Sequence, residues 1–140
     1  MLKATSTAQA KEFIDDLPEK MNNPIAQAGS NVSGGQKQRL SIARALVKQP
    51  QIYLFDDSFS ALDFKTDSQL RQALNKEIND ATLIIVAQRI STIMQAEKII
   101  VLDKGKIVGT GTHRDLLSSC KVYREIAESQ LSTIELQEDK

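Results

Sequence analysis

Apolar residues between positions 33 and 49 recur every three or four residues, as they do along one side of a surface helix. That side consists of Leu40, Ala43, Leu46 and Val47. Ser33 and Gln36 have the three-residue spacing of a capping box, so we expect the helix to begin near Ser33. Pro50 has no backbone N–H group and therefore ends the pattern.

A continuous apolar run, residues 52–55, follows this helix and predicts a strand that is covered on both faces in a parallel sheet. Asp56 and Asp57 stand at its carboxyl end, the edge at which open α/β sheets bind ligands. An aspartate at that edge can hold Mg²⁺ directly or through its waters. Because adjacent strand residues point to opposite sides, we expect the two carboxylates to have different roles.

The remaining elements follow from the same periodicities. We expect a helix over 5–17 ended by Pro18, a helix over 67–78, a turn at Asn79 and Asp80, a second buried strand over 82–87, a short helix over 91–96, a hairpin of strands 98–102 and 106–109, and a last helix from Thr112 to about Ser129. The second strand would bring Gln88 beside Asp56 and Asp57. Helices alternating with parallel strands predict an α/β fold.

Composition limits the chemistry. The chain has 140 residues, one domain at most, with 18 basic residues balanced by 18 acidic ones, which gives no electrostatic sign of a nucleic-acid partner. The single cysteine, Cys120, excludes an internal disulfide and is expected to pack on a helix. The first residues lack the apolar core of a signal peptide, and no window approaches the ~20 apolar residues of a membrane span.

Glycines at the start of the first helix suggest an anion seat. Gly34 and Gly35 keep side chains away from the positive end of the helix dipole, so backbone N–H groups there can approach a phosphate. The capping pattern by itself favours an ordinary helix cap without a ligand.

Longer motifs add to this interpretation. Residues 31–39, NVSGGQKQR, resemble the signature motif of ATP-binding-cassette (ABC) ATPases. Residues 52–57, IYLFDD, resemble the Walker B strand of that family, and 60–63, SALD, resemble its D-loop. Residues 82–93 resemble the switch region of the exporter branch, and 98–117 its strand-turn-strand-helix ending. The similarity extends from about residue 10 to residue 130, and the order and spacing of three motifs make it specific.

The resemblance implies a partial P-loop NTPase fold, a mostly parallel sheet flanked by helices, without the N-terminal Walker A portion. It implies that residues 1–130 form the C-terminal part of a nucleotide-binding domain and that 131–140 form a polar tail. Within the first part, 1–30 would be the tail of the helical subdomain and 31–49 the signature with its helix. Residues 50–130 would contain Walker B, the D-loop, the switch and the C-terminal region.

It also implies the site residues. Those expected to bind ATP are Ser33, Gly34, Gly35, Gln36 and Asp63. Asp56 is the expected Mg²⁺ ligand, and Asp57 and Gln88 are the expected catalytic positions. In the family, each ATP lies between the Walker motifs of one subunit and the signature of the other, so the expected partners are a second nucleotide-binding domain, head to tail, and a transmembrane domain.

Two substitutions and one absence modify that expectation. Asp57 stands where the family usually has Glu, and Gln88 where it usually has His, as in the degenerate-site subunit of heterodimeric exporters. The phosphate-binding pattern G-x-x-x-x-G-K-[ST] does not occur in the sequence. We therefore expect the isolated chain to lack ATPase activity, because that loop supplies much of the electrostatic stabilisation in phosphoryl transfer. His113, past the switch, is expected at the surface.

The parent protein is thus expected to be a multidrug or lipid-like substrate exporter at the cytoplasmic face of the cell membrane. Two alternatives stay open from the sequence. One is a chromosome-maintenance type of ATPase, which would need a long heptad coiled coil before the signature. The other is a non-catalytic module that docks on a full ABC subunit through its signature helix.

Overall fold

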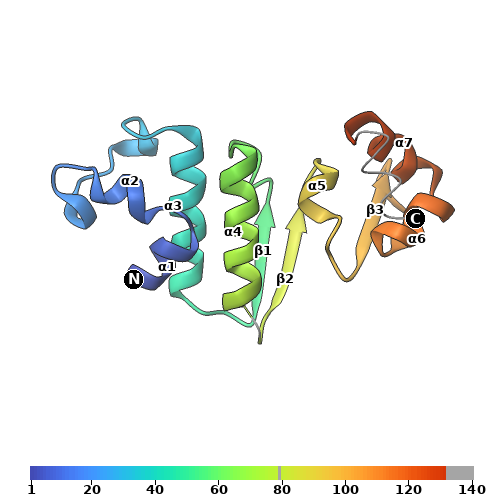
Figure 1. Cartoon of the computed structure of the whole chain (residues 1–140), viewed down its shortest axis with the longest axis horizontal. Helices are drawn as coiled ribbons and strands as arrows, with labels where there is room; N and C mark the ends of the chain where they lie inside the picture. Colours follow the sequence, from blue (N-terminus) through green and yellow to red (C-terminus); the bar gives the residue numbers. More distant parts are fainter. Residues whose placement is uncertain (79, 132–140) are drawn as a thin grey trace. The chain divides into compact units, whose positions relative to one another are not determined.

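A computed structural model describes residues 1–78 and 80–131, and it contains two compact units, Met1–Val86 and Ala87–Lys140 (Figure 1). The predicted turn at Asn79 and nearly all of the predicted polar tail lie outside the described residues. Within the described ranges, no helix has both the length and the apolar character needed to cross a membrane.

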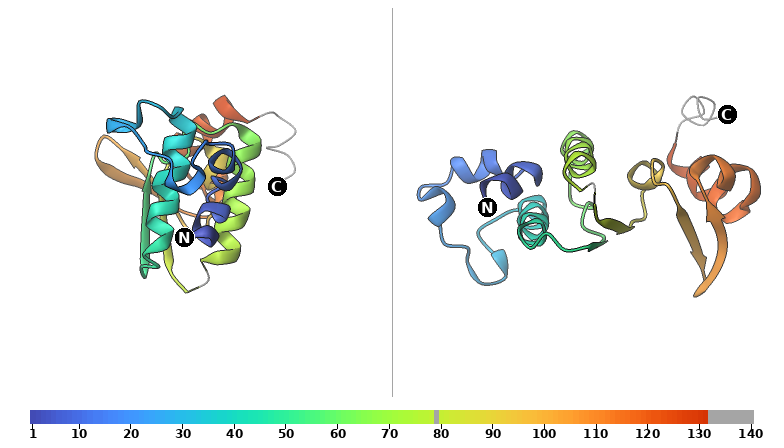
Figure 2. Two further views of the ribbon diagram at one scale, coloured as in Figure 1. Left: turned by 90° about the vertical axis from the view of Figure 1, so that its left-hand side faces the viewer. Right: turned by 90° about the horizontal axis from the view of Figure 1, so that it is seen from below.

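The first unit places two helices against one face of a parallel strand pair. Strands β1 (Ile52–Asp56) and β2 (Thr82–Val86) run parallel with Ile52 opposite Thr82, which confirms the predicted pairing. Helices α3 (Gly34–Val47) and α4 (Phe64–Glu77) lie next to each other in both views of Figures 1 and 2. The short helix α1 (Leu2–Thr7) contacts both of them.

The core of this unit lies between the helices and the sheet. It consists of Ala4, Ala8, Ala10, Ile14, Ile42, Ala43, Leu46, Tyr53, Phe55, Phe59, Leu62, Leu70 and Leu74. Tyr53 and Phe55 are buried, whereas Ile52 is 61% and Leu54 64% exposed. The prediction that both faces of this strand are covered is therefore wrong for the part of the chain that the structure describes, because α3 and α4 cover one face only.

The N-terminal segment forms two short helices where the sequence predicted one over 5–17. After α1 the chain turns at Gln9, which has a left-handed φ of 54°, and α2 (Lys11–Asp15) follows. Helical spacing of apolar residues does not reveal such a turn, since a left-handed residue interrupts the backbone without changing the composition. Two 3₁₀ turns, η1 (Lys20–Asn22) and η2 (Gln27–Gly29), then lead to the signature.

In the second unit, the short helix α5 (Ile90–Ile93) precedes an antiparallel pair of strands, β3 (Ile99–Asp103) and β4 (Lys106–Gly111). Lys104 and Gly105 both have positive φ at the turn, so the predicted hairpin is confirmed.

The last predicted helix is two helices, α6 (His113–Ser119) and α7 (Lys121–Gln130). The break falls at Cys120, whose backbone is extended at φ −116° and ψ 106°. The start is as predicted, because Thr112 caps α6 in a capping box with Asp115.

The core of the second unit contradicts the predicted placement of His113 and confirms that of Cys120. It consists of Ile90, Ile99, Val101, Leu116, Cys120, Tyr123 and Ala127. His113, predicted at the surface, is only 6% exposed, and its Nδ1 lies 2.6 Å from the hydroxyl oxygen of Tyr123. The bond from Nδ1 to Tyr123, ten residues away, lowers the cost of burying the imidazole ring. The position of His113 in the sequence does not indicate that bond. Cys120 packs in this core, as predicted.

Candidate functional site

The N-terminus of α3 is built as the sequence predicted. The backbone N–H of Gln36 donates to Ser33 Oγ at 3.2 Å, and the backbone N–H of Ser33 donates to Gln36 Oε1 at 2.8 Å, so the capping box is complete. The first N–H groups of a helix have no acceptor within the helix, and Gly34 and Gly35 place no side chain over them. Such a helix end carries partial positive charge and favours an anion.

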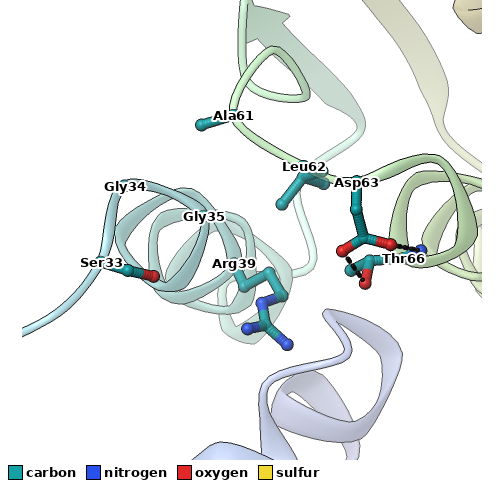
Figure 3. A pocket seen from close by; sticks show the side chains of 8 residues that line it. All are labelled: Ser33, Gly34, Gly35, Arg39, Ala61, Leu62, Asp63 and Thr66. Atoms are coloured by element: carbon teal, nitrogen blue, oxygen red, sulfur yellow. Dashed lines mark hydrogen bonds between the residues drawn. The ribbon is translucent and has the colours of Figure 1, made fainter.

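A pocket of about 360 Å³ opens beside this helix end (Figure 3). It is lined by Ser33, Gly34, Gly35, Arg39, Ala61, Leu62, Asp63 and Thr66. Three of the predicted ATP-binding residues on α3 and Asp63 on the D-loop therefore share one pocket. The two segments are about 30 residues apart in sequence, and both line the pocket in Figure 3.

The two glycines differ in how closely the D-loop approaches them. A Cβ atom at position 35 would lie 3.0 Å from the carbonyl oxygen of Ala61, closer than backbone atoms normally tolerate. A Cβ atom at position 34 would lie 3.6 Å from the Ala61 Cβ atom, which is ordinary van der Waals contact. A side chain at position 35 would therefore push against the D-loop backbone, whereas a Cβ atom at position 34 would not.

Asp63 has a local structural role in addition to lining the pocket. Its Oδ1 accepts from the Thr66 backbone N–H at 2.9 Å and its Oδ2 from the Thr66 hydroxyl at 2.7 Å, so it caps α4. The backbone N–H of Thr66, and then its hydroxyl, hold the pKa of the Asp63 carboxyl below its usual value. This cap explains why the helix begins at Phe64, three residues before the predicted start at residue 67.

Asp56 and Asp57 differ in backbone conformation. Asp56 is the last residue of β1, whereas Asp57 has a left-handed φ of 47°. The Asp57 N–H donates to Val86 O at 3.0 Å, and its carbonyl accepts from Ser60 Oγ at 3.0 Å. The expectation that the two carboxylates diverge by strand alternation thus rested on the wrong geometry, because Asp57 lies in a turn. Aspartate adopts this conformation more readily than most residues.

Gln88 belongs to the second unit, whereas the other predicted site residues belong to the first. Its backbone carbonyl accepts from Gln130 Nε2 at 2.9 Å, and Gln130 Oε1 accepts from the Ile90 N–H at 2.9 Å. The side chain of Gln130 at the end of α7 therefore bonds to the backbone at Gln88 and again two residues later, at Ile90.

Two residues of α3 that the sequence did not single out make long-range contacts. Arg39 Nη1 donates to Gln9 O at 2.7 Å, and its guanidinium carbon lies 4.8 Å from the centre of the Phe13 ring. Gln38 bonds to the loop after β1. Both lie within the quoted motif, but polar residues on an amphipathic helix predict only a solvated face.

The residues of the pocket fit the phosphate end of a nucleotide. The backbone amides at the start of α3, which no side chain covers, and the nearby Arg39 suit an anion. The one carboxylate that lines the pocket, that of Asp63, already accepts a hydrogen bond from Thr66. None of the described residues that line the pocket is aromatic, so it offers no stacking surface for a base. Around Asp56, no group of three possible ligands among His, Cys, Asp and Glu occurs in the described ranges. A single carboxylate such as Asp56 is chemically suited to Mg²⁺, which commonly takes one or two carboxylates together with phosphate oxygens and water.

Comparison with known proteins defines the class. Residues 3–60 match the family model of ABC transporters. The chain resembles a solved chain described as a bacterial Atm1-family ABC exporter with ATP bound, with a TM-score of 0.88 and 38% identity over 92% of this chain and 23% of that one. The chain therefore has the mixed α/β fold of an ABC ATPase of the P-loop NTPase type, here represented by a portion of that fold.

The curated relatives include ABC transporter ATP-binding proteins and a flippase, so the chain resembles a part of such proteins. An ABC transporter ATP-binding protein of Mycobacterium bovis is 50% identical over 93% of this chain. An ATP-dependent lipid A-core flippase of Albidiferax ferrireducens is 42% identical over 93% of this chain. The chain spans 22% of the length of each of these relatives.

Proposed function

We propose that this chain provides the signature side of an ATP site in an ABC exporter, completing an ATP bound on a second nucleotide-binding domain that lies head to tail with it. The observation that carries the proposal is the capped, side-chain-free start of α3 opening into the pocket with Asp63. Ser33, Gly34, Gly35 and Gln36 would face the terminal phosphate of the partner's ATP.

Each of these residues has a definite task in that arrangement. The backbone amides at Gly34 and Gly35 would donate to phosphate oxygens, and the helix dipole would favour their negative charge. Gln36 and Ser33 keep each other in place through the capping box, so the amides are preorganised before the anion arrives. Bound ATP with Mg²⁺ supplies a phosphoryl group for transfer to water.

Asp56, Asp57 and Gln88 would belong to the ATP site on this chain's own Walker side. We propose that Asp56 holds Mg²⁺ and that Asp57 and Gln88 form a slow, degenerate site of a heterodimeric exporter. Asp57 is one methylene shorter than glutamate, and a misplacement of about 1 Å can cost on the order of 10²-fold in rate. Gln88 donates a neutral hydrogen bond, and neutral bonds are roughly half as strong as charge-assisted ones.

The cargo and the location follow from the relatives only as proposals. A relative named as a lipid A-core flippase supports an amphipathic, lipid-like substrate. A transmembrane domain would be the second partner and would place the chain at the cytoplasmic face of the membrane. We expect no ATP hydrolysis by the 140-residue chain alone, because its sequence contains no phosphate-binding loop motif.

The experiment measures by sedimentation whether the 140-residue chain associates with a complete ABC exporter ATP-binding domain when MgATP is added. Hydrolysis by the complete domain is blocked so that its ATP stays bound. The test variant is Gly34→Glu, which has room for its Cβ and adds a favourable charge to the helix start, yet places a carboxylate in the anion seat. Gln72→Glu adds the same charge at an exposed site on α4 and serves as control.

We expect association with MgATP for the unchanged chain and for Gln72→Glu, and association at least tenfold weaker for Gly34→Glu. Equal association of all three forms without nucleotide would instead support the non-catalytic docking module. No association under any condition would refute both functions.

A further inference from the structure

Gln38 connects α3 to the loop that follows β1. Its Nε2 donates to the Asp57 carbonyl at 3.1 Å and to Ser60 Oγ at 3.0 Å, and its Oε1 accepts from the Ala61 backbone N–H at 2.9 Å. Both donors of the side-chain amide and one acceptor position are therefore used. The three partners lie 19 to 23 residues further along the chain.

The neighbouring polar residues of α3 make different contacts. Gln36 bonds back to Ser33 in its own helix cap, and Arg39 bonds to Gln9 in the N-terminal segment. Only an amide matches the set of partners around Gln38, because a carbonyl needs a donor and a backbone N–H needs an acceptor. A lysine or arginine at position 38 would leave the Ala61 N–H without this acceptor.

The bonded loop carries groups of both proposed sites. Asp57 is at its start and Asp63 lies two residues after its last residue, Ala61, while Ser33 to Gly35 stand about one helical turn before Gln38. A Cβ atom at position 35 would lie 3.0 Å from the Ala61 carbonyl oxygen, so the start of α3 comes close to the residue whose N–H bonds to Gln38. The helix start and the loop are thus joined by a side-chain tie and lie close together.

We propose that Gln38 is a positioning residue that couples the signature end of α3 to the Asp57 loop, so that occupation of one ATP site alters the backbone of the other. The inference rests on the proposed function, in which the helix end serves the partner's ATP and Asp57 serves this chain's own. Coupling of this kind requires an element that both sites bias, and the loop 57–61 is that element.

The test compares amide hydrogen exchange, measured by NMR on the full 140-residue chain, for the unchanged protein and three variants. Gln38→Leu removes all three bonds with little change in volume. Gln38→Glu keeps an acceptor for the Ala61 N–H but removes the donor to the Asp57 carbonyl. Gln72→Leu, at an exposed position of α4, controls for an added leucine, and thermal unfolding of each variant establishes that it folds.

In the free chain we expect Ala61 to exchange about fivefold faster or more in Gln38→Leu, since about one net hydrogen bond is lost. Exchange in Gln38→Glu should lie between the unchanged value and that of Gln38→Leu, because its carboxylate accepts from the Ala61 N–H but cannot donate to the Asp57 carbonyl. Gln72→Leu should match the unchanged chain. Equal Ala61 exchange in Gln38→Leu and the unchanged chain would overturn the tie.

The coupling is read by adding MgATP and the complete ABC exporter ATP-binding domain. We expect residues 57–61 to gain protection in the unchanged chain and in Gln72→Leu, and Gln38→Leu to associate without that gain. A full gain in Gln38→Leu overturns the coupling while leaving the proposed function intact. No association of the unchanged chain would overturn the proposed function, and the coupling with it.

Discussion

Alanine at positions 34 and 35 should have opposite effects on stability, although the two residues are neighbours in the first turn of α3. Either substitution gains helix propensity, up to about 1 kcal/mol over glycine. That gain largely cancels when the two variants are compared with each other. The difference between them therefore reports what each new Cβ atom meets.

At position 35 the new Cβ meets the Ala61 carbonyl oxygen at 3.0 Å, and at position 34 it meets a methyl group at 3.6 Å. A carbonyl oxygen can yield only by moving the backbone, and Gln38 holds that backbone through the Ala61 N–H. Overpacking of this kind costs about 1–3 kcal/mol. We therefore expect Gly35→Ala to be less stable than Gly34→Ala by about 1–3 kcal/mol.

The assay is urea unfolding followed by NMR signals of residues in the first unit, since the second unit has its own core. With a denaturant slope of about 1–3 kcal/mol/M, the midpoints should differ by roughly 1 M. Midpoints that agree within error would refute the reasoning, because they would mean that the D-loop moves aside without cost. Gly34→Ala alone should unfold at or above the midpoint of the unchanged chain.

Three further predictions concern stability. Leu74→Ala should cost about 2–5 kcal/mol in urea unfolding of the first unit, because Leu74 is fully buried on α4; a loss under 1 kcal/mol would show a loosely packed core. Tyr123→Phe should cost the second unit about 1–2 kcal/mol, because it removes the hydroxyl bonded to the buried His113, and an unchanged midpoint would contradict that bond's role. The Thr112 backbone N–H, and then the Thr112 hydroxyl, lower the pKa of Asp115 below 3.8. The contribution of Asp115 to stability is therefore present above pH 3.8 and is lost as the pH falls through the folded pKa. Asp115→Asn should flatten the acid limb of stability plotted against pH, and an unchanged limb would contradict this role of Asp115.

Local rules predicted the elements whose signals lie within a few residues. The capping box at Ser33, the stop before Pro50 and the turn at Lys104 and Gly105 each depend on chemistry between near neighbours. The parallel pairing of β1 and β2 also followed, because a helix connects two apolar runs.

The wrong predictions concern residues whose conformation or burial depends on a partner far away in the sequence. Gln9 interrupts the predicted first helix, and its carbonyl accepts a hydrogen bond from Arg39, thirty residues away. His113 is buried beside Tyr123, whose hydroxyl forms a hydrogen bond with the His113 ring. The exposed face of β1 reflects which segments cover the sheet, and an apolar run does not contain that information. The role of Gln38 was hidden for the same reason, since a glutamine on a polar helix face resembles any solvated residue.

The left-handed backbone at Asp57 limits how this position can change over generations. Asparagine and glycine accept that conformation as well as aspartate does, but they discard the carboxylate. Glutamate keeps the carboxylate and fits the conformation less well. Random substitution is therefore steered toward residues that preserve the fold and lose the charge, whereas glutamate carries a conformational cost. Loss of the carboxylate at this turn is thus easier to reach by mutation than a longer acidic side chain.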